Sequence, residues 1–66
     1  MRTMSKLIWH PCSERLPDSG RLVSVTVEEP GRWYTGTAVY WRGAWYLDGC
    51  EMIYGRVLEW AEERYA

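Results

Sequence analysis

His10, Cys12 and Cys50 are the side chains in this 66-residue sequence best suited to bind a metal ion or to act as a nucleophile with its base. His10 and Cys12 stand two residues apart, so they would share one face of a strand. A structural zinc site takes four ligands, usually with paired Cys-x-x-Cys spacing, and a fourth ligand is not evident. A catalytic Cys–His pair needs a third, orienting group, for which no motif is present. We therefore expect no metal, no cofactor and no enzymatic activity.

Paired acidic residues are the second pattern that could support chemistry, and they occur as Glu28-Glu29 and Glu62-Glu63. Neighbouring side chains diverge in regular secondary structure, so we interpret both pairs as parts of solvated faces. The sequence also contains no Gly-rich phosphate-binding loop and no G-x-S-x-G motif. These observations favour a binding protein over an enzyme.

The composition is that of one small globular domain. The chain has five Trp, five Tyr and no Phe, with 47% hydrophobic and 26% charged residues. A domain of this length buries only about 60% of the surface of its extended chain, so the core is expected to be marginal. Eight basic and nine acidic residues give a formal charge of −1, which argues against a dedicated binder of duplex DNA.

Cysteine usage and the first residues bear on localisation. Two cysteines are too few for the disulfide framework of a small secreted protein. Residues 1–6 are polar and basic, but no apolar segment of a signal peptide follows them. We expect a cytoplasmic protein with both thiols reduced.

The N-terminal part of the chain is predicted to hold one short strand, one helical turn and one β-turn. Residues 1–6 are interpreted as a loose leader, and the apolar run at 7–10 as an edge strand stopped by Pro11. Residues 13–16 fit a single helical turn that begins with a capping Ser. Residues 17–20 are Pro, Asp, Ser and Gly, the residue types of a turn.

The middle of the chain is predicted to form a meander of strands. Residues 22–28 show the clearest strand pattern, because three valines alternate with polar residues. Residues 33–41, rich in β-branched and aromatic types, form a second strand. The tight connection Arg42-Gly43 returns the chain as an antiparallel strand over 44–47, and Asp48-Gly49 turns it again.

The segment 56–66 fits two structures. A helix is favoured by four residues at helical spacing: Val57, Leu58, Ala61 and Tyr65. Residues 57–60 could equally form a closing strand, and we prefer a strand to about residue 60, with a frayed or helical tail over 62–66. Residues 1–66 are thus predicted to be one all-β domain, an antiparallel meander of about four strands curled toward a partly closed barrel, with one short helical turn near the N-terminus.

The hairpin around Arg42-Gly43 divides its side chains between two faces. If these two residues form the turn, Tyr40 faces Trp45, Val39 faces Tyr46 and Ala38 faces Leu47. We assign one set to the core: Ala38, Tyr40, Trp45 and Leu47. The other face carries Trp33, Thr35, Thr37, Val39, Trp41 and Tyr46.

Several short motifs resemble the DUF551 family. The first half of the resemblance is Trp9, the run Ser13-Glu14-Arg15-Leu16-Pro17, Gly20 and Val23-x-Val25. The second half is Ala38-x-Tyr40, Gly43-x-Trp45 and Val57-x-x-Trp60. The resemblance spans residues 8–61 and implies a small protein of the kind met in phages and prophages, a family without an assigned function. The chain departs from the family at its end, where AEERYA replaces a Leu-Pro-rich segment.

The run Ser13–Pro17 is interpreted as structural: Leu16 and Pro17 are expected to pack on the indole of Trp9, while Glu14 and Arg15 bond loop backbone groups. The aromatic residues of the matching positions, Trp9, Tyr40, Trp45 and Trp60, are then expected to build the scaffold.

The second hairpin face is the predicted functional surface. The N-terminal loop or the C-terminal tail could cover it, but we favour an exposed patch that binds another protein, because Trp, Tyr and Arg dominate interface hot spots. The predicted protein-binding residues are Trp33, Trp41, Tyr46, Arg32, Arg42 and Val39. Arg56 could add to the rim.

The predicted partner is a host or bacterial defence protein, whose complex would be inhibited in the manner of an anti-CRISPR protein. This prediction rests on the resemblance and on the aromatic face, not on any motif. Two alternatives stay open. The first is a single-stranded nucleic-acid-binding module in which Trp33, Tyr34 and Trp41 stack bases beside Arg32 and Arg42. The second is a homodimeric structural protein without a defence role.

Overall fold

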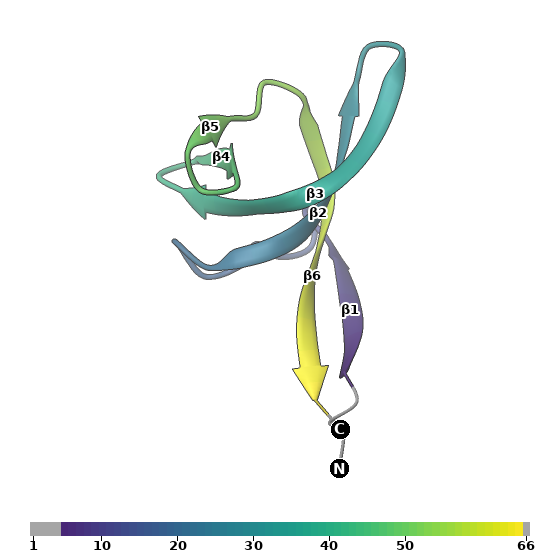
Figure 1. The fold of residues 1–66 in the computed structure, drawn as a ribbon, viewed down its shortest axis with the longest axis vertical. Helices are drawn as coiled ribbons and strands as arrows, with labels where there is room; N and C mark the ends of the chain where they lie inside the picture. Colours follow the sequence, from purple (N-terminus) through teal and green to yellow (C-terminus); the bar gives the residue numbers. More distant parts are fainter. Residues whose placement is uncertain (1–4, 66) are drawn as a thin grey trace.

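The computed structural model describes residues 5–65, which form one antiparallel sheet of six strands (Figure 1). The strand order is β1-β6-β2-β3-β4-β5, so β1 and β5 are the two edges and the sheet is not closed into a barrel. The strands are β1 Ser5–Pro11, β2 Leu22–Glu29, β3 Arg32–Trp41, β4 Ala44–Leu47, β5 Glu51–Met52 and β6 Arg56–Tyr65. The prediction of an all-β antiparallel domain is confirmed, with six strands instead of about four.

The two ends of the described chain pair with each other, which corrects the predicted leader and tail. β1 pairs with β6 from Ser5↔Tyr65 to Pro11↔Glu59. The leader predicted over 1–6 therefore contains two strand residues, and residues 1–4 lie outside the described part. The tail predicted over 62–66 is a strand as far as Tyr65, because backbone pairing with β1 outweighs the helical spacing of its side chains.

The segment that joins β1 to β2 contains a turn where a helical turn was predicted. The N–H groups of Glu14 and Arg15 both donate to the carbonyl of Pro11, at 3.0 and 3.2 Å. Pro17 follows before a second turn could form, and the residue before a proline is disfavoured in the helical region. No helix occurs between Ser5 and Tyr65, and hence none that could span a membrane.

The β3–β4 hairpin has the predicted register. Tyr40 pairs with Trp45, Val39 with Tyr46 and Ala38 with Leu47. Arg42 and Gly43 have φ values of 50° and 82°, which are typical of the type I′ turns that match the twist of two-residue hairpins. The rings of Tyr40 and Trp45 form an edge-on pair with centroids 5.2 Å apart.

One face of the sheet carries the core. The three predicted inward valines of β2, Val23, Val25 and Val27, are buried with Ala38 of β3 and Trp60 of β6. The pairing of β2 with β6 shifts by one residue between Thr26 and Val27. We call this side the core face and the opposite side the outer face.

Trp60 is the largest fully buried side chain. Its Nε1–H donates to the carbonyl oxygen of Arg15 at 2.9 Å. The ring of His10 lies 4.6 Å from the indole, centroid to centroid, and the guanidinium of Arg15 lies 5.6 Å from it. Trp60 thus joins β6 to β1 and to the loop between β1 and β2.

Trp9 does not take the scaffold position beneath Leu16 and Pro17 that its place in the sequence predicted. Its side chain is 40% exposed and that of Leu16 is 45% exposed, whereas Pro17 is buried. Trp9 lies beside Ala61 on the outer face, because the two residues are paired in the β1–β6 ladder. The loop containing Ser13–Pro17 bonds Trp60 instead.

We expect Trp60→Phe to lower the free energy of unfolding by about 1–3 kcal/mol, because it removes a hydrogen bond and packed volume at a buried site. Trp9→Phe is the matched control and should change it by less than about 0.5 kcal/mol, since Trp9 is partly exposed. Urea denaturation followed by circular dichroism measures both. Equal losses in the two variants would contradict the central role of Trp60.

Candidate functional site

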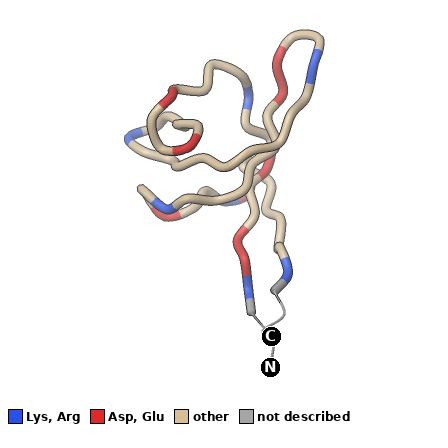
Figure 2. The backbone as a smooth tube through the Cα atoms, in the orientation of Figure 1, with Lys and Arg blue, Asp and Glu red and all other residues tan. Residues whose placement is uncertain are grey.

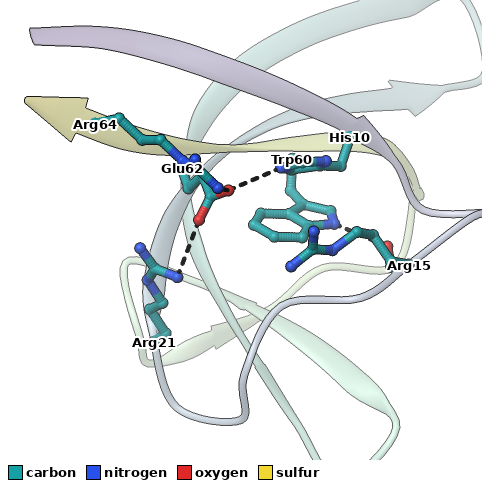
Figure 3. Close-up of polar contacts among 6 residues, drawn as sticks. All are labelled: His10, Arg15, Arg21, Trp60, Glu62 and Arg64. Atoms are coloured by element: carbon teal, nitrogen blue, oxygen red, sulfur yellow. Dashed lines mark hydrogen bonds and ion pairs between the residues drawn. The ribbon is translucent and has the colours of Figure 1, made fainter. Parts of the chain in front are cut away.

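A buried carboxylate surrounded by basic side chains is the densest polar cluster in the described chain (Figure 3). Glu62 is only 9% exposed. Its Oε1 accepts hydrogen bonds from His10 Nε2 at 3.1 Å and from Arg64 at 3.0 Å. Its Oε2 lies 3.5 Å from a guanidinium nitrogen of Arg21. The cluster ties together β1, β6 and the residue that precedes β2.

The contacts of Glu62 lower the pKa of its carboxyl group below the ordinary value of 4.5. The hydrogen bond from His10 is the largest cause, followed by that from Arg64, while burial opposes them. Every partner in this cluster is a donor or a cation, and no nucleophile accompanies them. The arrangement is that of a satisfied structural ion network.

This cluster was not predicted from the sequence. Glu62 and Glu63 were interpreted as a solvated pair, but strand alternation sends Glu62 to the core face and leaves Glu63 exposed on the outer face. The pairing of β1 with β6 could have indicated the cluster, since it places Trp60 opposite His10. Because that pairing was not predicted, the proximity of Glu62 to His10 could not be inferred.

The residues with metal-binding or nucleophilic chemistry are not brought together. His10 is bound to Glu62, and Cys12 is half-buried with its backbone N–H donating to the carbonyl of Leu58. Burial, reinforced by the charge of Glu59, raises the pKa of the Cys12 thiol, which opposes thiolate formation. Among the residues that the structure describes, no group of three or more His, Cys, Asp or Glu side chains could hold a metal ion.

An apolar patch on the outer face is the best candidate for a binding site. Leu22 of β2 pairs with Val39 of β3, which in turn pairs with Tyr46 of β4, so the three side chains form one row across three strands. Trp41 extends the row along β3. We call Leu22, Val39, Trp41 and Tyr46 the outer patch.

The outer patch is accessible and partly hollowed. Leu22 is 58% exposed and Trp41 is 46% exposed. Val39, Trp41 and Tyr46 line a hollow of about 380 Å³ together with Gly20, Gly49 and Cys50. The guanidinium of Arg42 stacks on Trp41 at 5.5 Å from the ring centroid, which holds a positive charge at the rim.

The six predicted protein-binding residues divide into two groups. Val39, Trp41, Tyr46 and Arg42 gather at one end of β3, as the preceding contacts show. Trp33 is 67% exposed but lies at the opposite end of β3. Trp41 lies eight positions after Trp33 along β3, a separation of up to about 26 Å for an extended strand. The prediction missed Leu22, because it considered only the β3–β4 hairpin.

Arg32 does not rim the outer face. Its guanidinium lies 5.0 Å from the ring of Tyr34 and 2.8 Å from a carboxylate oxygen of Glu29. Tyr34 packs against the core cluster, so Arg32 follows the core side of β3. Arg32 and Trp33 meet only at the tip of the β2–β3 hairpin, where they line a hollow of about 680 Å³ with Tyr54 and Arg56.

The stacking platform considered for single-stranded nucleic acid is not assembled. Tyr34 and Trp33 lie on opposite faces of β3, and Trp33 is distant from Trp41. Acidic and basic residues are interspersed along the strands and turns instead of forming one basic track (Figure 2). A groove that follows a phosphate backbone needs such a track.

Comparison with protein-family models, curated proteins and solved structures returned no match for this chain. The resemblance to the DUF551 family therefore stays a prediction, and so do the phage origin and the defence-related partner that follow from it.

Acidification should weaken the fold through Glu62. The carboxyl group of Glu62 binds a proton less readily in the folded than in the unfolded chain. Its contribution to the stability of the folded state is therefore complete above the ordinary pKa of 4.5. That contribution is lost as the pH falls through the lower pKa of the folded state. We expect Glu62→Gln to be less stable than wild type at pH 7 and to lose less stability between pH 5 and about pH 3.

Thermal unfolding at a series of pH values measures this difference. Glu63→Gln is the matched control, because Glu63 is exposed on the other face, and it should keep the wild-type pH dependence. An unchanged acid dependence in Glu62→Gln would show that the cluster does not act in this way.

Proposed function

We propose that this chain is a non-catalytic protein-binding module that docks a partner protein on the outer patch. The observation that carries the proposal is the cross-strand row of Leu22, Val39 and Tyr46 with the exposed indole of Trp41 beside it. An interface centred on aromatic and aliphatic side chains with an Arg at the rim is the common composition of binding hot spots.

The rest of the sheet supports this choice of surface. The core face is occupied by the chain's own residues, including Trp60 and the loop bonded to it. On the outer face, two hydroxyl groups are already bonded within the chain: Thr26 donates to Glu59 at 3.1 Å and Thr37 donates to Asp48 at 2.8 Å. A partner can therefore cover the outer patch without leaving these hydroxyl groups unpaired.

The resemblance to the DUF551 family suggests that the partner is a protein of a host or bacterial defence complex. This part of the proposal depends on the resemblance and not on the outer patch. The outer patch itself favours an apolar protein surface, because its side chains offer few hydrogen bonds to a polar ligand. It also favours protein over nucleic acid, since Arg42 is the only cation stacked on the patch within residues 5–65.

Trp41→Ser should abolish capture of the partner while leaving the fold intact. The immobilised chain is incubated with a bacterial lysate that also contains a differently tagged second copy, and bound proteins are identified by mass spectrometry. Trp33→Ser is the matched control, because it removes an equally large exposed indole from the far end of the same strand. We expect it to retain the bound protein.

Thermal unfolding verifies that both variants fold. The proposal is wrong if Trp41→Ser and Trp33→Ser retain the same proteins as wild type. It is also wrong if the recovered material is nucleic acid whose binding weakens steeply with added salt, since that dependence reports phosphate contacts.

A further inference from the structure

We infer that the free edge of β1 is a strand-addition site, at which an extended segment of a partner protein with alternating apolar and acidic residues pairs antiparallel with this chain. The inference goes beyond the proposed function, because it concerns the edge of the sheet and not the outer patch. It is drawn from backbone groups of β1 that point away from the sheet, and from the different side chains on the two sides of this strand.

The backbone groups of β1 alternate between the side of β6 and the free side. The N–H of Cys12 donates to the carbonyl of Leu58 at 3.0 Å, one position beyond the last pair of the β1–β6 ladder. Bonded and non-bonded pairs alternate in an antiparallel ladder. The even-numbered residues of β1 therefore bond β6, whereas Leu7 and Trp9 direct their N–H and C=O groups to the free side.

Pro11 agrees with this direction. It has no N–H to donate to β6, and its carbonyl accepts from the N–H groups of Glu14 and Arg15, which lie outside the ladder. Proline is tolerated in an edge strand where its N–H side faces away from the neighbouring strand. Pro11 also ends the free edge, so the partner segment pairs with the residues before it.

The free edge of β1 is long and apolar. β1 contains seven residues, whereas β5 at the other edge of the sheet contains two. Figure 1 shows β1 on the outside of the sheet, beside the end of β6. The side chains of Leu7 and Trp9 are 47% and 40% exposed, and within residues 5–65 no other strand pairs with this edge. Such an edge is a template on which another strand adds.

The core side of β1 carries an excess of positive charge. Lys6 is exposed, lies opposite Arg64 in the ladder and forms no ion pair among the described residues. Arg64 and Arg21 both contact the single carboxylate of Glu62. The outer side of the same strand presents only the apolar side chains named above.

An acidic residue opposite Lys6 complements this charge. Lys6 bonds β6, so in the new ladder it stands in a non-hydrogen-bonded pair, where opposite side chains approach most closely. The next residue of the segment lies beside Leu7, where an apolar side chain packs. Another copy of β1 would instead bring a second lysine to the positive side, which disfavours pairing of two copies at this edge.

Amide hydrogen exchange followed by NMR tests the inference. In the free chain, the amides of Ile8 and His10 should be protected and those of Leu7 and Trp9 should exchange rapidly, since only the first two bond β6. A capped peptide of about eight residues that alternates valine with glutamate is then added to about 1 mM. It should slow exchange at Leu7 and Trp9 by about 2- to 10-fold. The matched peptide with lysine in place of glutamate should bind about 2- to 5-fold more weakly.

Leu7→Pro is the sharpest variant, because it removes an N–H group that the fold does not use. It should stay folded and weaken binding of the glutamate peptide by about 10-fold or more. Leu7→Ala is the matched control, since it keeps the N–H group, and it should bind within about 5-fold of wild type. Ile8→Pro removes a bond of the β1–β6 ladder and should lower the melting temperature far more than Leu7→Pro does.

The inference is overturned if the glutamate peptide leaves Leu7 and Trp9 unprotected, if the lysine peptide protects them equally, or if Leu7→Pro and Ile8→Pro are equally destabilised. Protection that grows with protein concentration without peptide would identify a second copy as the occupant and would also overturn it. Trp41→Ser should bind the peptide as wild type does, so a failure at this edge can be told apart from a failure of the outer patch.

Discussion

The burial of one indole, that of Trp60, is the constraint on which the rest of the structure depends. A sheet without helices or a second sheet must cover its apolar face with its own loops. Trp60 achieves this because its N–H bonds the carbonyl of Arg15, which holds the long loop between β1 and β2 against the core. The same side chain contacts His10, so the edge strand, the loop and the centre of the sheet share one anchor.

The Glu62 cluster extends this anchor toward the free end of β1 and β6. Residues 62–65 of β6 pair with β1 alone, since the pairing of β6 with β2 ends at Ala61. A two-stranded ribbon is marginally stable in water. The bonds from His10, Arg21 and Arg64 to one carboxylate connect this ribbon to the residue that precedes β2.

Local pattern predicted the middle of the chain correctly because its interactions are local. The alternation in β2 and the turn at Arg42-Gly43 fixed the inward valines and the β3–β4 register. The remainder depends on pairing between residues far apart in sequence, which periodicity does not report. That is why β6 was predicted too short, why the loop containing Ser13–Pro17 was expected to pack on Trp9 instead of Trp60, and why Leu22 was omitted from the binding surface.

The position of β6 between β1 and β2 also determines the order in which the molecule can be assembled. The β2–β3–β4 meander closes through short connections, whereas the β1–β6 ladder joins residues up to 60 positions apart, Ser5 with Tyr65. Contacts of such long sequence separation slow folding. During synthesis, the meander with its outer patch is thus complete while Trp60 is still missing from the core, and the apolar faces of β2 and β3 stay open until β6 arrives.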